Sequence, residues 1–142
     1  MSFQIGPYTI GSGHSPIIVA ECGINWSACR NGMSRRSELV RARELIAAAA
    51  EAGAQVVKFQ SHLAQAEMLK GGPSAGYIGG NFYDLIQSCE LNLDEHLHLK
   101  GFSETWGVAF MSTPFSREAA DLLEQVGVPA YKTGSGELTN IP

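Results

Sequence analysis

Three charged side chains lie near the carboxyl ends of short, β-branched, apolar runs: Glu21, Lys58 and Lys132. Because side chains alternate between the two faces of a strand, each charge shares a face with apolar neighbours two positions away. A lysine ammonium group in such surroundings needs an anionic partner. The pattern therefore predicts either an ion pair between Glu21 and one lysine or, because two lysines outnumber one glutamate, a site for a phosphate or carboxylate ligand.

Two hydroxyl residues are expected at the same level of the sheet. Thr113 ends one apolar run, and Ser135 follows the next one between two glycines that let backbone amides approach a ligand. Each is a common turn residue by itself, but their place at the ends of successive strands favours a ligand site. Glu137, close to Lys132, is either a second acid or base or a surface carboxylate.

The histidines and cysteines do not form a metal-binding pattern. No CxxC pair is present, so we expect neither a disulfide framework nor a zinc site, and we expect free thiols. We assign no histidine as a metal ligand, because His96 and His98 are two positions apart on a predicted helix and face away from each other. The other residues of these types are His14, His62, Cys22, Cys29 and Cys89.

The composition is that of one ordinary globular domain. Of the 142 residues, 44% are hydrophobic and 17% are charged. The net charge of -4, with dispersed basic residues, argues against a nucleic-acid partner or an anionic membrane surface. No apolar run approaches the ~20 residues of a membrane span and the start lacks an export signal, so we expect a cytoplasmic protein. The basic cluster within residues 35–43 is predicted to be a solvated helix face.

Short β-branched runs alternate with helical patterns, which is typical of a βαβα chain with a parallel sheet. We predict a small hairpin at 8–13 and strands at 17–22, 55–60, 108–113 and 129–134. Helices are predicted over 34–52, 81–88, 93–106 and 117–125, with an irregular stretch at 61–80. The expected helix caps are Ser34, Ser116 and either Asn92 or Asp94.

Four βα steps fit either a doubly wound sheet or the first half of an eight-stranded barrel, which takes ~250 residues. The phosphate-binding motifs G-x-G-x-x-G and G-x-x-x-x-G-K-[ST] are both absent, so neither a dinucleotide nor a nucleoside triphosphate is indicated.

Four segments of the sequence carry a family resemblance. They are 19–25 (VAECGIN), 53–60 (GAQVVKFQ), 112–115 (STPF) and 132–140 (KTGSGELTN). In this order, over residues 17–142, they resemble the amino-terminal half of N-acetylneuraminic acid (sialic acid) synthases and their legionaminic and pseudaminic acid relatives.

The resemblance implies a fold and an activity. Family members are (β/α)₈ barrels of TIM type followed by a small antifreeze-like domain, and residues 1–142 would supply about the first four βα units. The resemblance further implies condensation of phosphoenolpyruvate with an N-acetylated amino sugar, such as N-acetylmannosamine, to a nonulosonic acid plus phosphate. Mn²⁺ or Mg²⁺ would be the cofactor, with its ligands outside these residues.

The resemblance also assigns individual roles. Gln60 matches a residue near the sugar, Glu21 a carboxylate near the reacting carbons, and Glu137 a carboxylate that contacts the sugar and moves protons. The residues that match the phosphoenolpyruvate-binding positions are Lys58, Thr113, Lys132 and Ser135.

Two features leave alternatives open. Residues 25–32 replace the shorter Asn-His-Asn-Gly turn of the family, which leaves the sugar open. Half a barrel would also expose unpaired strand edges, which predicts a homodimer or an unstable chain. The alternative functions are a catalytically silent anion-binding or interaction module, and a related 3-deoxy sugar acid synthase.

Overall fold

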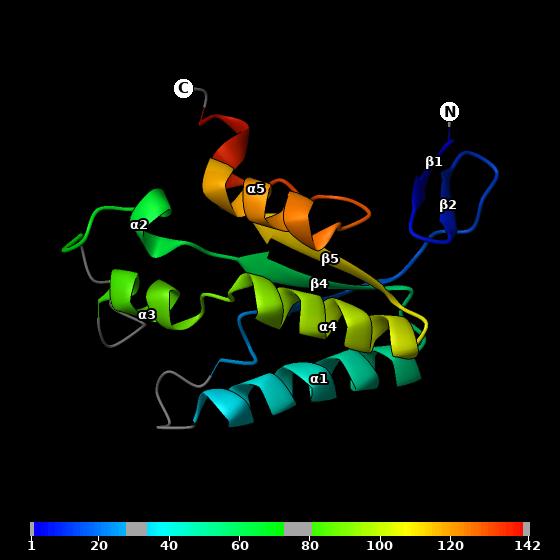
Figure 1. The fold of residues 1–142 in the computed structure, drawn as a ribbon. Coiled ribbons are helices and arrows are strands. Elements are labelled where there is room, and N and C mark those ends of the chain that lie inside the picture. Colours follow the sequence, from blue (N-terminus) through cyan, green and yellow to red (C-terminus); the bar gives the residue numbers. More distant parts are fainter. Residues whose placement is uncertain (1, 28–33, 73–80, 141–142) are drawn as a thin grey trace.

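A computed structural model describes residues 2–27, 34–72 and 81–140, and it shows an α/β fold built on a parallel sheet (Figure 1). The three strands lie in the order β3 (Val19–Gly23), β4 (Val56–Ser61) and β5 (Ala109–Pro114). Sequential order and parallel pairing confirm the βαβα expectation. Because all strands run the same way, their carboxyl ends meet at one edge of the sheet.

The strand predicted at 129–134 is wrong. Within the described residues, the segment contributes an isolated parallel bridge between Tyr131 and Ser112, and the Lys132 N–H donates to the Ser112 carbonyl oxygen at 3.4 Å. Pro129 brings no backbone donor, and β5 is the neighbour that the bridge pairs with. The chain then enters the short 3₁₀ helix η1 (Gly136–Leu138).

Helices α1 (Arg35–Glu51) and α4 (Leu93–Thr105) pack on one face of the sheet, and α5 (Arg117–Val126) contacts α4 and β5. The core between them contains Ile46, Phe59, Phe110 and Leu99. Phe59 and Phe110 face this side because successive residues of a strand alternate between the two faces of the sheet.

The predicted helix caps are confirmed. The side chains of Ser34 and Ser116 accept hydrogen bonds from the backbone N–H groups of Ser37 and Ala119. Between the two candidates for α4, Asn92 is the cap, and it forms a capping box with Glu95. None of the helices in the described ranges combines the length and apolar character of a bilayer span.

The hairpin lies earlier than predicted. Strands β1 (Ser2–Ile5) and β2 (Tyr8–Gly11) pair in antiparallel fashion, so Tyr8 begins the second strand and Gly6 lies in the turn. Gly6 has φ +56°, and a Cβ there would lie 3.2 Å from the Ala109 Cβ, so the turn needs glycine. The Tyr8 hydroxyl donates to the Gly107 carbonyl at 3.0 Å.

The hairpin covers the face of the sheet opposite to α1 and α4, at the amino ends of the strands. Ile5 packs there against Val56, Ala109 and Met111. We call this face of the sheet the inner face. Its other end, near the carboxyl ends of the strands, holds the charged residues described below.

The stretch after β4 is more regular than predicted. Ser61 still belongs to β4, and a short helix α2 (Ala64–Glu67) follows at once, whereas residues 73–80 lie outside the described ranges. The predicted helix at 81–88 is confirmed as α3 (Phe82–Ser88), which contacts α2. Both helices lie beyond the carboxyl end of β4 (Figure 1).

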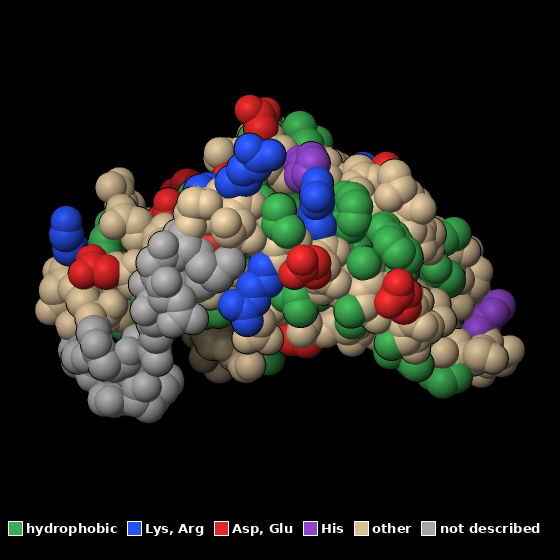
Figure 2. Space-filling model, turned by 90° about the horizontal axis from the view of Figure 1, so that it is seen from below, with side chains coloured by type: hydrophobic (Ala, Val, Ile, Leu, Met, Phe, Trp, Pro, Cys, Tyr) green, Lys and Arg blue, Asp and Glu red, His purple; other side chains and the backbone are tan. Residues whose placement is uncertain are grey.

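The basic cluster within 35–43 is only partly solvated, so that prediction needs correction. Arg36 and Arg41 are exposed, but Arg35 and Arg43 are half-buried, and the Arg35 guanidinium lies 5.0 Å above the ring of the buried Trp26. On the face that α1 and α4 form, basic and acidic side chains are interspersed with apolar ones (Figure 2).

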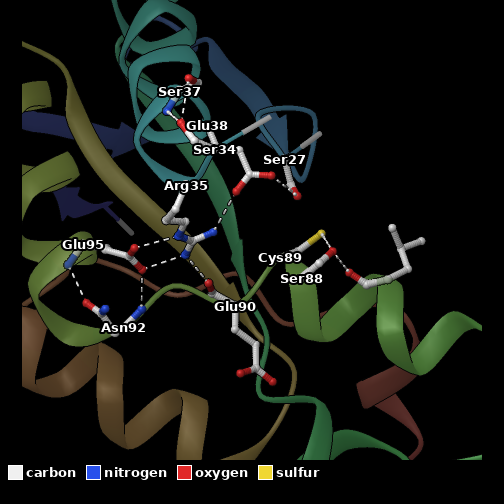
Figure 3. Close-up of polar contacts among 11 residues, drawn as sticks. Ser27, Ser34, Arg35, Ser37, Glu38, Ser88, Cys89, Glu90, Asn92 and Glu95 are labelled. Carbon is white, nitrogen blue, oxygen red and sulfur yellow. Dashed lines mark hydrogen bonds and ion pairs between the residues drawn. The ribbon is translucent and has the colours of Figure 1, made fainter. Parts of the chain in front are cut away.

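Arg35 ties the first turns of two helices together (Figure 3). Its Nε and Nη2 donate to the two carboxylate oxygens of Glu95 at 2.7 Å, its Nη1 to Glu38 at 3.3 Å, and its Nη2 also to the Glu90 carbonyl. Burial opposes ionisation of Glu95, but bonds from Arg35 and the Asn92 N–H together lower its pKa below the ordinary value. This network fixes the loop that precedes α4.

Candidate functional site

Glu21, Lys58 and Thr113 form a row across three neighbouring strands of the inner face. Glu21 on β3 stands opposite Lys58 on β4 in the ladder, and their side chains form an ion pair. The Lys58 Nζ also donates to the Thr113 Oγ1 on β5 at 3.4 Å. The ion-pair alternative from the sequence is therefore confirmed, with Lys58 as the partner lysine.

The two members of the pair differ in exposure. The Lys58 side chain is 13% exposed, whereas the Glu21 side chain is 51% exposed. The ammonium group therefore depends on nearby oxygen atoms, while the carboxylate remains open to a ligand. A phosphate or carboxylate that arrives from solvent meets Lys58 with part of its charge already balanced.

Gly23 brings Glu21 close to Gln60. The ladder shifts register between Glu21 and Gly23, which has φ +51°, and the Gly23 N–H donates to Glu21 Oε1 at 2.9 Å. A Cβ on Gly23 would lie 3.6 Å from that oxygen and 3.7 Å from the Gln60 Nε2. The glycine thus leaves space between the two functional side chains.

Gln60 stands opposite Thr113 in the ladder and contacts a histidine whose role the sequence analysis missed. The His62 Nε2 lies 3.1 Å from the Gln60 Oε1, and the His62 ring stacks on Phe115 with centroids 4.3 Å apart. The signal was available: positions 60 and 62 follow each other at strand period, so their side chains share a face.

Lys132 lies beside this row but outside its hydrogen bonds. Its backbone is joined to Ser112, so the residue is the neighbour of Thr113, and its exposed ammonium group donates to the Thr133 carbonyl at 2.5 Å. In the described part of the chain, Lys132 has no carboxylate partner. Lys132 is therefore the second of the two predicted lysines, the one whose charge Glu21 does not balance.

Ser135 and Glu137 are placed at the same end of the sheet without joining the row. Ser135 is exposed and directly precedes η1, and Glu137 accepts from Asn140 Nδ2 at 3.1 Å. No hydrogen bond within the described ranges connects either residue to Glu21, Lys58 or Thr113. The structure thus brings together part of the predicted site.

Glu137 lines a groove of about 600 Å³ at this end of the molecule. Glu67 of α2, Phe115 and Arg117 line it as well, together with Tyr131. Burial, with help from the Glu124 carboxylate that its hydroxyl contacts, raises the pKa of Tyr131 to about 12. Tyr131 therefore acts as a hydrogen-bond donor at neutral pH rather than as a base.

A buried polar cluster lies on the helix side of the same strand ends. The Ser61 Oγ contacts the His96 Nε2 and the Ser112 Oγ, each at 2.7 Å, and the His96 Nδ1 donates to the Asn92 carbonyl at 2.9 Å. Burial lowers the pKa of His96, so its ring is neutral and Nε2 accepts from Ser61. The cluster fixes the ends of β4 and β5 against α4.

The cysteines and histidines offer no metal or thiolate chemistry in the described ranges. Burial raises the pKa of Cys22 to about 11, and the thiols of Cys22 and Cys89 are both buried. Cys29 lies outside the described residues. Within those residues no group of three or more His, Cys, Asp or Glu side chains could hold a metal ion.

Comparisons with known proteins identify the family of the chain. The sequence profile of the NeuB family matches residues 45–142, more than half of the chain. The N,N'-diacetyllegionaminic acid synthase of Legionella pneumophila is 36% identical over 138 residues, which cover 93% of this chain and 36% of that protein. The N-acetylneuraminate-9-phosphate synthase of Homo sapiens is 25% identical and covers 94% of this chain.

A solved structure shows the same arrangement of elements. The crystal structure of N-acetylneuraminic acid (sialic acid) synthetase from Leptospira borgpetersenii, in complex with citrate, superposes with a TM-score of 0.78 at 25% identity. The match covers 99% of this chain and 43% of that one, and the chain spans about 36% of the length of its curated relatives. On the profile match, the shared sequence and the shared fold, the chain belongs to the NeuB family of sialic and nonulosonic acid synthases.

Proposed function

We propose that this chain provides the phosphoenolpyruvate-binding part of a synthase that condenses phosphoenolpyruvate with an N-acetylated amino sugar, such as N-acetylmannosamine. The products are a nonulosonic acid and phosphate. The observation that carries the proposal is the row of Glu21, Lys58 and Thr113 across three parallel strands, at the edge where ligands of such sheets bind. The names of the relatives support the reaction class.

Phosphoenolpyruvate carries two anionic groups, a phosphate and a carboxylate, and the proposed site has two lysines to bind them. Lys132 has its charge unbalanced among the described residues, and Lys58 is desolvated beside a hydroxyl donor. Thr113 and Ser135 add hydroxyl donors at the same end of the sheet. This donor set binds an anion more strongly than either lysine would alone.

The condensation itself forms a carbon–carbon bond between C3 of phosphoenolpyruvate and the aldehyde carbon of the open-chain sugar. Water then adds at C2, and the resulting tetrahedral intermediate expels phosphate. These steps require one group to give a proton to the aldehyde oxygen and one to accept a proton from water. We assign acceptance of the proton from water to Glu21, the anionic partner of Lys58, and donation of a proton to the aldehyde oxygen to Glu137 in its carboxylic acid form.

The family implies Mn²⁺ or Mg²⁺, but the described residues do not fit such an ion. Glu21 is paired with Lys58, and Glu137 accepts from Asn140. Among the described residues, neither carboxylate belongs to a group of three or more side chains that could hold a metal ion. We therefore assign the metal ligands to polypeptide other than these residues and derive no step through the metal.

The inner face needs more strands than the described sheet provides. We propose that the chain contributes the first βα units of a (β/α)₈ barrel. The remaining strands come from further polypeptide, as in its longer relatives, or from a second copy in a homodimer. Light scattering separates the two arrangements, because only the homodimer gives twice the mass of the expressed chain.

Calorimetric titration with phosphoenolpyruvate tests the binding role. Loss of one charge-assisted contact predicts at least about tenfold weaker binding for Lys58→Ala and for Lys132→Ala. Lys100→Ala is the matched control, because Lys100 lies on α4 in an exposed ion pair with Glu104, and its affinity should equal that of the wild type. Unchanged affinity in Lys58→Ala would overturn the proposal.

Phosphate release with N-acetylmannosamine and Mn²⁺ tests turnover separately. A synthase releases phosphate only when both substrates are present. Binding of phosphoenolpyruvate without phosphate release, across N-acetylated sugars, would identify a catalytically silent anion-binding module instead. Release with a phosphorylated aldose alone would identify a 3-deoxy sugar acid synthase.

A further inference from the structure

The side-chain amide of Gln60 is held by two buried side chains, His62 and Glu67. The His62 Nε2 lies 3.1 Å from the Gln60 Oε1, and the His62 Nδ1 donates to Glu67 Oε2 at 2.9 Å. The side chains of His62 and Glu67 are only 5% and 6% exposed. Oxygen atoms face both ring nitrogens, and the contact with the Gln60 oxygen is a hydrogen bond when Nε2 carries the hydrogen.

These contacts give the Gln60 amide one direction. An amide offers an oxygen on one side and an NH₂ group on the other. Because the oxygen is toward His62, the NH₂ group is toward β3, where the Gln60 Nε2 approaches the space above Gly23 that Glu21 Oε1 also borders. Gln60 therefore presents donor hydrogens beside the proposed catalytic carboxylate.

The histidine ring is fixed by a second contact. It stacks on Phe115 at an interplanar angle of 14°. The same Phe115 ring lies 3.2 Å from the position that a Cβ on Gly134 would take. Phe115 thus lies between the His62 ring and the backbone that follows Lys132, and it couples the end of β4 to the proposed anion-binding segment.

Glu67 is anchored in turn. Its Oε1 accepts from the Leu63 N–H at 2.7 Å, and the Ala64 N–H donates to Glu90 Oε1 at 2.7 Å. The Glu90 carbonyl belongs to the Arg35 network of Figure 3. The short helix α2 is therefore held at its start, and a chain of contacts runs from the Arg35 network through α2 to Gln60.

We propose that His62 is a positioning residue that, held by Glu67 and Phe115, fixes the Gln60 amide so that its NH₂ group donates to an oxygen of the acceptor sugar. This inference rests on the proposed function for the identity of the ligand. It assigns sugar selection to a polar relay on β4 and α2, separate from the lysines that bind phosphoenolpyruvate.

Steady-state kinetics of phosphate release, measured on the full-length protein that the gene encodes, test the relay. His62→Phe keeps the ring on Phe115 and removes both N–H donors. We expect the KM for N-acetylmannosamine to rise about tenfold, with the KM for phosphoenolpyruvate within about twofold of the wild type. Gln60→Ala should show the same change.

The double variant Gln60→Ala with His62→Phe identifies the route. If His62 acts through Gln60, the double variant is no worse than Gln60→Ala alone. His62→Gln, whose amide can still donate to the Gln60 oxygen, should recover part of the loss. A rise in both KM values together, or losses that multiply in the double variant, would overturn the positioning role.

Two further variants control for misfolding of His62→Phe. His62→Phe leaves the buried Glu67 carboxylate without its histidine partner, so His62→Phe with Glu67→Gln is made in parallel. The glutamine oxygen still accepts from the Leu63 N–H. His98→Phe is the matched control, because His98 is exposed on α4. It should leave both KM values unchanged.

A spectroscopic measurement separates failure of this inference from failure of the proposed function. If the wild-type protein releases no phosphate, the proposed function fails, but the relay is still judged by the side-chain ¹⁵N–¹H resonances of Gln60. We expect these resonances to shift in His62→Phe and to stay in place in His98→Phe. Unchanged Gln60 resonances in His62→Phe would overturn the relay whatever the activity.

Discussion

The carboxylate of Glu21 and the ammonium group of Lys58 face each other from directly opposed positions of two parallel strands. The pair is asymmetric, because the lysine is largely buried and the glutamate is half exposed. If phosphoenolpyruvate binds at Lys58 as we propose, the site must accommodate the Glu21 charge next to an anionic group of the substrate. The same arrangement would hold a carboxylate close to the substrate, where proton transfer requires it.

Glu21→Gln should separate binding from turnover. Without the carboxylate, the positive charge of Lys58 is no longer balanced by Glu21, so phosphoenolpyruvate should bind more tightly. The condensation rate should fall at least about a hundredfold, because a proton-transfer group is lost. Calorimetry measures the first effect and phosphate release the second. Weaker binding together with undiminished turnover would contradict the assigned role.

Arg35→Met should destabilise the fold by about 2 kcal/mol, because it removes the guanidinium that donates to Glu95, to Glu38 and to the Glu90 carbonyl. Arg36→Met, at the exposed neighbouring position, should cost less than about 0.5 kcal/mol. Urea unfolding of both variants measures the difference. Equal midpoints would show that the Arg35 network carries no stability.

His96 should make stability depend on pH. Its folded-state pKa is lowered by burial, so its contribution is fully present above the unfolded pKa of about 6.5 and is lost as pH falls through the folded-state value. The free energy of unfolding should therefore decrease below about pH 6.5. In His96→Gln this part of the decrease should disappear, and an identical pH profile in the two proteins would refute the assignment.

Gly101→Ala should stabilise the protein by about 0.5–1 kcal/mol, because the residue lies within α4 and a Cβ there meets no atom within 4 Å. Gly107→Ala is the contrasting variant. Its surroundings are equally open, but its φ of +69° is strained for alanine, so it should lose about 1 kcal/mol. Thermal unfolding should therefore shift in opposite directions, and shifts of the same sign would contradict the argument.

Elements with local signals were predictable from the sequence. The caps Ser34 and Ser116 bond to N–H groups three positions away, so sequence spacing alone identifies them. Strand alternation likewise predicted that Glu21 shares a face with Val19, and Lys58 with Val56 and Gln60. The choice of Lys58 rather than Lys132 as the partner of Glu21 depends on which strands are neighbours, which is a tertiary property.

The failures have a common physical origin. The segment around Tyr131 has the composition of a strand, but it bridges to β5 at a single position. The spacing of positions 60 and 62 indicates that Gln60 and His62 share a face, but the stacking of His62 on Phe115 joins the end of β4 to the segment after β5. The sequence alone does not reveal contacts that form only when distant segments meet.

The β1–β2 hairpin gives the inner face a closed floor. Ile5 of β1 packs against Met111 of β5, so the hairpin covers this end of the face, whereas Glu21 at the carboxyl ends of the strands is half exposed. In the barrel that we propose, both substrates and both products would therefore share the opening at the carboxyl ends. A sugar bound in that opening would block the exit of a phosphoenolpyruvate molecule bound deeper, so such an enzyme should bind its substrates in a compulsory order.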